Sequence, residues 1–338
     1  MATSLKTIEK GVSTIVEVDN GIINLLFPVK RRNTTEYIEY DTATVEGVLP
    51  EYNSFRNSAN VVQKDGWDVV RVAPANFNES ITQEAIDAFE RQFGQSEEGN
   101  GTIDSKTMSI LTQLGKLRLR SEVMKKKITY EALTKFKIEK GFVDKNGNVQ
   151  DIVFGVPTEN RKIVSTTWDD ANATPLDDIK NQAKVLKVPP TYCIMNDTTY
   201  DYFEGNAQVL TANKDDGTRR NFVPNEKVVS GKDLYLAGKI IYRGLILDVY
   251  VEKGTYEDKN GVTQKFLPDG EVILASPKGE FHYGGIPKIA NDKPVVLAKE
   301  FDVSKVLQQD PPMLKYIYKS APLPVLKNGN AFGSLQVL

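Results

Sequence analysis

Residues Tyr256 to Leu274 read YEDKNGVTQKFLPDGEVIL, and the Asp-Lys-Asn-Gly within this stretch occurs a second time from Asp144. The tetrapeptide resembles the start of a calcium-binding loop, which requires oxygen ligands at positions 1, 3 and 5, glycine at position 6 and glutamate at position 12. Counted from Asp258, position 6 is Thr263, and counted from Asp144, position 12 is Gly155. Both loops therefore fail as metal sites. Asn-Gly between β-prone residues instead predicts a hairpin with a type I′ turn, in which both central residues have positive φ.

The composition is that of an ordinary globular protein, with 338 residues, 40% hydrophobic and 26% charged residues and a formal net charge of −2. This length allows two or more hydrophobic cores. The near-zero charge gives no general attraction to nucleic acid or acidic membranes. Glu122 and Glu131 dilute the lysine run 125–127, so we interpret that run as a solvated helix face rather than a binding patch. There is no signal peptide and no apolar run of the ~20 residues that a membrane span needs, so we expect a protein made and folded in a cytoplasm.

Residues suited to catalysis or metal binding are scarce. His282 is the only histidine and Cys193 the only cysteine, which excludes an intrachain disulfide, a multi-cysteine zinc site and a HExxH zinc site. The sequence has no phosphate-binding glycine loop and no Gly-x-Ser-x-Gly motif. The aspartate pairs at residues 169–170 and 177–178 could perform acid–base chemistry, but carboxylates at a helix start more often complement the helix dipole. We therefore predict no catalytic residue, no cofactor and no bound metal.

Two strand-like runs near the N-terminus predict a long hairpin. Residues 35–45 and 65–73 are rich in β-branched and aromatic residues, and a polar loop that contains Pro50 separates them. The edges of such a hairpin are open and invite pairing with another chain. Either the rest of the protein or another subunit must therefore cover it.

Two helical patterns follow the hairpin. Residues 80–94 begin with a capping box, Ser80 with Gln83, and end at a glycine. Apolar residues then recur at helical spacing over residues 103–140, with Gly141 at the C-cap position. A helix of this length spans roughly 50 Å. It is long for a globular domain and suits a spine on which other parts rest.

Residues from about 142 to 285 alternate strands and helices, which predicts an α+β domain. A helix over residues 175–186 and a buried strand over residues 190–197 precede a second short helix. The run 238–257 reads as two strands broken at Gly244. Strand patterns return towards the C-terminus, which we expect to rejoin the long helix. The simplest arrangement is one domain inserted between two segments of another.

Residues Tyr242 to Ile286, taken together, resemble the hallmark region of the phage lambda major capsid protein family, the major head protein E family. The shared pattern is Y-x-G, a strand, a hairpin with NG and FLPD, a V-x-L strand and YG-x-I. The segment Asp310 to Val325, which contains SAPL, and the terminal SLQVL are similar to the last strands of that family. The stretch LLFPVKRRNTTEYIEYD resembles its N-terminal arm and the start of its hairpin. The resemblance covers most of the chain. Over residues 95–140 only the helical pattern matches the family, and individual residues do not.

The resemblance implies an α+β fold, the Hong Kong 97-type capsid fold. Its expected parts are an N-terminal arm (1–32), an E-loop hairpin (33–75), a peripheral domain with the long spine helix (76–145), an inserted axial domain (146–289) and return strands of the peripheral domain (290–338). In this fold the E-loop would lie across a neighbouring subunit. The residues of this chain that we expect to make that intersubunit contact are Tyr37, Tyr40, Asp65 and Trp67.

The resemblance also implies the function, which is that of a major capsid protein of a tailed, lambda-like bacteriophage (a siphovirus) without catalytic activity. Copies of the chain would assemble through pentamers and hexamers into an icosahedral shell around double-stranded DNA, with which they make non-specific contact. Assembly would take place in the cytoplasm of the host bacterium, and the protein would end in the virion. The expected partners are a portal, a decoration protein and a separate scaffolding protein, since no long charged helix precedes the arm. We expect no isopeptide crosslinks between subunits.

Two alternatives stay open at this point. An encapsulin, the shell protein of a cellular compartment, has the same fold and would be distinguished by a cargo enzyme rather than terminase and portal genes in its gene neighbourhood. A soluble α+β hydrolase that uses the aspartate pairs would form a small oligomer with a pocket. Alanine at Asp177 and Asp178 would then abolish an activity without affecting assembly.

Overall fold

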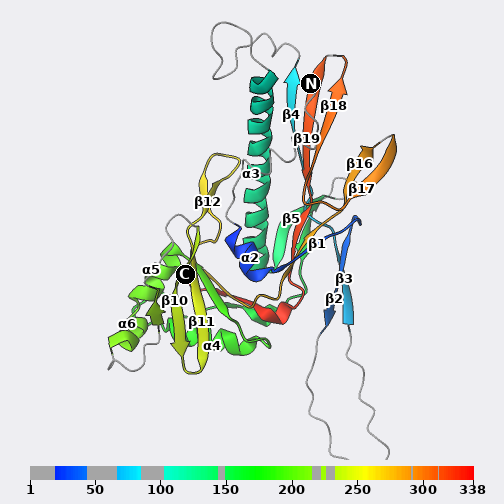
Figure 1. Cartoon of the computed structure of the whole chain (residues 1–338). Helices are drawn as coiled ribbons and strands as arrows, with labels where there is room; N and C mark the ends of the chain where they lie inside the picture. The colour runs from blue at the N-terminus through cyan, green and yellow to red at the C-terminus, as the bar shows by residue number, and fades with distance from the viewer. Residues whose placement is uncertain are drawn as a thin grey trace, which may run out of the picture.

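The structure is a computed structural model that describes residues 20–43, 67–84, 103–143, 149–214, 222–225, 233–290, 292–310 and 312–338. Figure 1 shows one long helix standing upright, with strands along its side and a sheet with short helices at its lower end. The helices are α2 (Gly21–Leu26), α3 (Ile103–Lys135), α4 (Pro175–Val185), α5 (Asp197–Gly205) and α6 (Ala207–Lys214), with short 3-10 turns at η2 (Thr158–Asn160) and η3 (Gly329–Ala331).

The strands form one large sheet and several small ones. The seven-stranded sheet has the order β7 (Arg161–Ile163), β21 (Phe332–Gln336), β14 (Glu271–Ala275), β8 (Tyr192–Asn196), β11 (Leu245–Glu252), β10 (Leu234–Tyr242) and β9 (Phe222–Pro224). The three-stranded sheets are β1 (Val29–Arg32), β15 (Glu280–Tyr283) and β20 (Pro322–Val325), and β18 (Asp302–Gln308), β19 (Met313–Ser320) and β4 (Phe77–Glu84). The two-stranded pairs are β2 (Ile38–Ala43) with β3 (Trp67–Val72), β5 (Lys137–Val143) with β6 (Val149–Val153), β12 (Thr255–Glu257) with β13 (Thr263–Lys265), and β16 (Ile286–Ala290) with β17 (Lys293–Leu297).

The seven-stranded sheet has a hydrophobic core on one face that α4, α5 and α6 cover. Side chains alternate along a strand, so Leu247, Val249 and Val251 of β11 all point into this core. Phe203 of α5 and Trp168, which precedes α4, pack there with their ring centroids 5.9 Å apart. The predicted helix at residues 175–186, the buried strand that follows it and the two strands broken at Gly244 are all confirmed.

The long helix α3 packs on two different partners along its length. Leu114 and Leu117, in its N-terminal half, contact Val303, Tyr316 and Tyr318 of the sheet β18–β19–β4. Its C-terminal half enters a second core, between the seven-stranded sheet and the strand β20. No helix within the described residues combines the length and the hydropathy that crossing a membrane requires.

The structure corrects the helix that the capping box predicted from Ser80. Residues Phe77–Glu84 instead form the strand β4, which pairs antiparallel with β19 from Phe77 opposite Ser320 to Glu84 opposite Met313. Eight cross-strand pairs with a tertiary partner outweigh the local capping signal, which is worth only about 1 kcal/mol. The remainder of the predicted helix, residues 85–94, lies outside the described residues.

The long helix also ends earlier than its sequence pattern predicts. It stops at Lys135, because Phe136 takes a left-handed conformation (φ 55°) and buries its ring in the core, after which β5 begins. Gly141 is therefore not a helix cap. It lies in β5, where an added Cβ would stand 2.8 Å from the Ile152 side chain, so this glycine is required by the close packing of β5 on β6.

The hairpin predicted at the repeated Asp-Lys-Asn-Gly is confirmed as β12–β13, but its turn type differs. Gly261 has positive φ, whereas Asn260 does not, so the turn is not type I′. The Asp258 carboxylate accepts hydrogen bonds from the backbone of Asn260 and Val262, which holds the loop closed. The type I′ signature, with positive φ at two consecutive residues, is found instead at Arg243-Gly244 between β10 and β11.

The last strand joins the large sheet. β21 pairs antiparallel with β14 and parallel with β7, and its Ser334 hydroxyl donates a hydrogen bond to the backbone oxygen of Thr134 in α3. The C-terminus therefore contacts the end of the long helix, as the sequence predicts. It does so as a strand of the seven-stranded sheet, whereas the boundaries drawn from the sequence group it with the return strands 290–338.

Candidate assembly surfaces

The hairpin predicted at residues 33–75 has its base in the antiparallel pair β2–β3. The register runs from Ile38 opposite Val72 to Ala43 opposite Trp67. Figure 1 shows this pair at the lower right, where it leaves the body of the molecule. In the part of the chain that the structure describes, neither strand pairs with a third strand. Among the described strands, both outer edges of this ribbon are therefore open, and an open strand edge is a template for pairing with another chain.

The four predicted contact residues have different surroundings. Tyr37 is half-buried beside the hairpin, and the Arg71 guanidinium lies 4.2 Å from its ring centroid. Tyr40 points inward, is 6% exposed, and its burial raises its pKa to about 12. The backbone of Trp67 pairs across the hairpin, whereas its side chain and all of Asp65 lie outside the described residues. Tyr37 is thus the described side chain of this set that reaches the surface.

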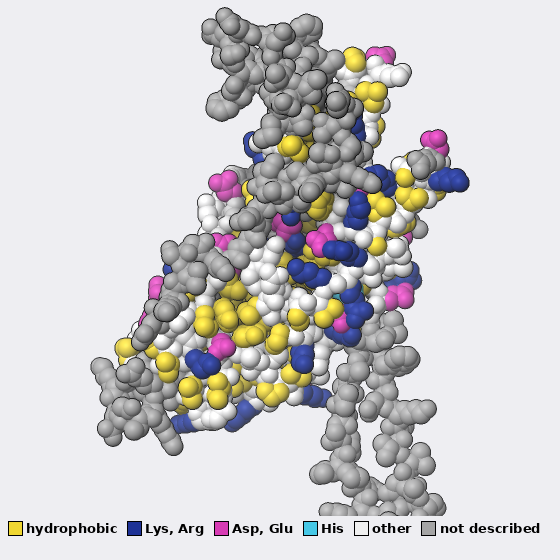
Figure 2. All heavy atoms as spheres, in the orientation of Figure 1, with side chains coloured by type: hydrophobic (Ala, Val, Ile, Leu, Met, Phe, Trp, Pro, Cys, Tyr) yellow, Lys and Arg dark blue, Asp and Glu magenta, His cyan; other side chains and the backbone are white. Residues whose placement is uncertain are grey.

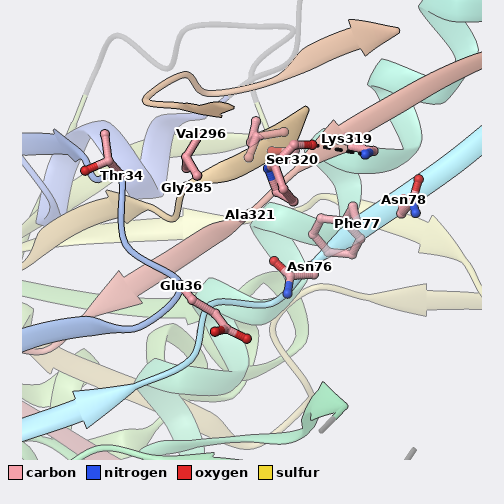
Figure 3. Close-up of a pocket in the computed structure, with 12 residues that line it drawn as sticks. Thr34, Glu36, Asn76, Phe77, Asn78, Gly285, Val296, Lys319, Ser320 and Ala321 are labelled. Atoms are coloured by element: carbon pink, nitrogen blue, oxygen red, sulfur yellow. Dashed lines mark hydrogen bonds between the residues drawn. The ribbon is translucent and has the colours of Figure 1, made fainter. Parts of the chain in front are cut away.

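A cavity of about 460 Å³ opens at the base of the hairpin. Figure 3 shows Thr34 and Glu36, which precede β2, facing Asn76 and the end of β19 across this space. The Lys319 ammonium, on the rim, donates a hydrogen bond to the backbone oxygen of Pro287 at 3.2 Å. Four segments far apart in the sequence meet here, so the hairpin leaves the body beside a partly open space, while Tyr40 on its inner side packs in the core.

A cluster of polar side chains around Glu280 holds the strand β1 on the body. The carboxylate accepts hydrogen bonds from Arg31 of β1 at 2.7 Å, from Lys327 at 2.9 Å and from the His282 ring at 3.1 Å. Burial favours a higher pKa for Glu280, but these three donors outweigh it and lower the pKa to about 2. Burial also lowers the pKa of His282, so its neutral ring donates through Nε2 and accepts from the Asn33 amide at Nδ1.

Acid is expected to weaken the fold through Glu280. A carboxyl group whose pKa is lowered by folding stabilises the protein fully above its unfolded pKa of about 4.3, and this contribution is lost as the pH falls towards 2. The Glu280→Gln variant should therefore lose less unfolding free energy than the parent between about pH 5 and pH 2. Urea unfolding at several pH values in this range measures it. In the control variant Glu257→Gln, whose side chain is exposed, the unfolding free energy should fall with pH as steeply as in the parent. An equally steep fall in Glu280→Gln would contradict the role given to Glu280.

A buried ion pair joins α3 to the seven-stranded sheet. The Lys126 ammonium (side chain 2% exposed) lies 2.9 Å from Oε1 of Glu252 in β11 (0% exposed) and 2.8 Å from the Asp233 carboxylate. The backbone N–H of Gly254 donates to the same Glu252 oxygen at 2.8 Å, and the Tyr130 hydroxyl donates to the other. Both carboxylate oxygens therefore have partners, as a buried charge requires.

The interpretation of residues 125–127 as a solvated helix face was wrong. Lys125 and Lys126 are both buried, and Lys125 pairs with Glu122 on the same helix. These lysines are buried because the C-terminal half of α3 packs in the core. The charge of Lys126 is balanced there by Glu252 and Asp233. Only the local pair with Glu122 was visible in the helical pattern, whereas Glu252 comes from a strand 126 positions away.

Comparison with known proteins identifies the family. The profile of the family described as phage major capsid protein E matches residues 4–337. The chain belongs to this family. No curated protein sequence matches it. Among solved structures, a protein assigned as the capsid protein of a prophage in Escherichia coli CFT073 is similar over 100% of both chains, with a TM-score of 0.65 and 14% identity. A chain of Mycobacterium phage Patience is similar over 98% of this chain and 86% of its own, with a TM-score of 0.50 and 10% identity.

Membership of the capsid protein E family fixes the function in outline. The protein is a structural, non-enzymatic phage major capsid protein that forms the icosahedral head shell, and it resides in the virion capsid. Its α+β fold is of the Hong Kong 97 type. The family resemblance inferred from residues 242–286 and 310–325 is thereby confirmed. An encapsulin, SrpI of Synechococcus elongatus PCC 7942, is similar with a TM-score of 0.49 and 11% identity over 100% of this chain and 91% of its own.

One of the two aspartate pairs of this capsid protein, Asp177 with Asp178, is used in its own packing. Asp177 accepts hydrogen bonds from the Tyr242 hydroxyl at 2.8 Å and from the Gln208 amide at 2.9 Å. Asp178 accepts one from the Trp168 indole at 3.2 Å, and its burial raises its pKa. These contacts tie α4 to α6 and to the β10–β11 turn. Among the described residues, no group of three or more His, Cys, Asp or Glu side chains is arranged to hold a metal ion.

Proposed function

We propose that this capsid protein closes its shell through two separate contacts, one of which is the hairpin that starts with β2 and returns with β3. The observation that carries the proposal is that this ribbon leaves the body with both edges unpaired among the described residues. A neighbouring copy that lies under the hairpin would cover those edges. In this arrangement Tyr37, Asp65 and Trp67 contact the neighbour, whereas Tyr40 supports the hairpin from inside its own subunit.

The second contact lies around the symmetry axes. We assign the seven-stranded sheet with α4, α5 and α6 to the axial domain, which meets its copies around the five-fold and six-fold axes. The long helix α3 and the sheet β18–β19–β4 correspond to the peripheral domain, residues 1–32 to the N-terminal arm and residues 33–75 to the E-loop. The buried pair of Lys126 and Glu252 supports a rigid link between the two domains, because it fixes the end of α3 on the sheet.

The remaining assignments follow the family resemblance. We propose a tailed phage of the lambda-like siphovirus kind, whose shell assembles from pentamers and hexamers with a separate scaffolding protein, a portal and a decoration protein. The net charge of −2 supports non-specific contact with the packaged double-stranded DNA, since the chain has no excess of positive charge to grip phosphates.

Negative-stain electron microscopy tests assembly directly. The full chain is purified alone and after co-expression with its neighbouring genes. We expect shells, tubes or capsomer rings in at least one sample, because subunits of a shell associate through several large interfaces. Monomers or dimers alone in both samples would contradict the proposed contacts. Shells that form with the chain alone would remove the proposed requirement for a separate scaffolding protein.

A further inference from the structure

One end of the seven-stranded sheet has a face that nothing in the described chain covers. The residues of β11 that alternate with its core positions point to this face. At the C-terminal end of β11, Tyr250 and Glu252 are covered by the core that α3 enters. Towards the β10–β11 turn, no described residue covers this face. Figure 2 shows hydrophobic side chains gathered over β10 and β11 on the lower part of the molecule. The open sheet face consists of Val223, Lys239, Ile241, Ile246 and Asp248.

The apolar members of the open sheet face are strongly exposed. Val223 is 39%, Ile241 44% and Ile246 60% exposed, and the two isoleucines stand directly opposite each other on β10 and β11. Lys239 and Asp248 also stand opposite each other and form an ion pair at 3.2 Å. A β-branched pair of this kind is typical of a sheet surface that packs on another layer.

The opposite side of the same domain carries a second exposed apolar surface. There α5 and α6 turn Phe203 and Val209 into the core and leave their outer residues in solvent. Tyr202 and Leu210 are each 42% exposed. The helical outer face consists of Asp201, Tyr202, Glu204 and Leu210.

We propose that the open sheet face of one copy packs on the helical outer face of the next copy around the symmetry axis. The proposal rests on the proposed axial contact and names the two surfaces that make it. A ring needs a head-to-tail contact between two different surfaces of the subunit, and these two lie on opposite sides of one layered domain. A contact between two open sheet faces would instead pair two copies and stop there.

The charges of the two surfaces are complementary. Lys239 lies beside Ile241 on the open sheet face and Arg243 lies in the adjoining β10–β11 turn, whereas the helical outer face offers Asp201 and Glu204 beside Tyr202. The cations also meet carboxylates of their own chain, Lys239 at Asp248 and Arg243 at Asp177. Both cations are solvent-exposed, so these pairs are weak and the cations can also attract an incoming acidic surface.

Crosslinking within assembled shells tests the contact. Leu210→Cys and Ile246→Cys are combined in the full chain, shells are purified, and a short bismaleimide is added before a denaturing gel. The native Cys193 does not interfere, because it is fully buried and burial raises the pKa of its thiol. We expect a ladder of covalent oligomers that ends at five and six subunits. Each single variant should stay monomeric on the same gel.

The control keeps Ile246→Cys and moves the second cysteine to Ile163, which is 69% exposed on β7 at the other edge of the sheet. This pair should give no ladder. The contact is overturned if the shells of the Leu210/Ile246 double variant give monomers only, or if Ile246→Cys alone gives dimers, which would show sheet faces meeting each other. If the first pair hinders assembly, Tyr202→Cys with Ile241→Cys carries the same test. Shells without a ladder leave the proposed shell function intact and reject only this contact.

Discussion

The Lys126→Met variant is expected to lose about 3–5 kcal/mol of unfolding free energy, the typical cost of removing one partner from a buried ion pair. The side chain of Glu252 is 0% exposed and would lose the ammonium group that lies 2.9 Å from its Oε1 in the parent. The hydrogen bonds from Tyr130 and Gly254 remain, but neither donor carries a full positive charge. Urea unfolding of the unassembled chain, followed by circular dichroism, measures the loss.

The neighbouring lysine provides the matched control for this prediction. Lys127 follows on the same helix but is only half-buried, with its ammonium 5.7 Å from the Tyr256 ring centroid. Lys127→Met should therefore cost less than about 1 kcal/mol. Adding Glu252→Gln to Lys126→Met removes the uncompensated charge, keeps an acceptor oxygen and should recover part of the loss. Equal losses for Lys126→Met and Lys127→Met would show that the pair does not hold α3 on the sheet.

The sequence predicts well the elements whose signals are local. The hairpin β12–β13, the helix α4 with its proline start and the two strands around Gly244 each carry their turn or cap residues within the element itself. The hydrophobic periodicity of these elements and the Gly, Pro and Asn residues at their ends are enough to predict them. The strand β4 shows the limit, because its capping box, Ser80 with Gln83, favours a helix and only the distant partner β19 makes it a strand.

The candidate surfaces also include features that local sequence signals predict and features that depend on distant partners. A hairpin at residues 33–75 could be predicted, because two β-rich runs flank a polar loop. The inward position of Tyr40 could not be, since it depends on which face of β2 meets the core. The burial of Lys126 was equally hidden, because its partners Asp233 and Glu252 lie more than 100 residues away and in different elements.

Deletion of residues 46–60 is expected to abolish shell formation while leaving a folded subunit. The deleted residues lie between β2 and β3 in the sequence and outside the described residues. Residues 44–45 and 61–66 remain to connect the two strands, which is more than a hairpin loop of roughly two to five residues needs. The β2–β3 pair and the core around Tyr40 should therefore persist. Thermal unfolding should match the parent within a few degrees, whereas electron microscopy should show no closed shells.

A second variant distinguishes the effect of the hairpin's length from the effect of its side-chain contacts. Replacing residues 46–60 by a Gly/Ser segment of equal length keeps the span but removes every side chain that could pack on a neighbour. If side-chain contacts with the neighbouring subunit close the shell, both variants fail to assemble. If span alone matters, the Gly/Ser variant assembles and the deletion does not. Normal shells from the deletion itself would show that this hairpin is not the intersubunit contact, and the open edges of β2 and β3 would then need a partner within their own chain.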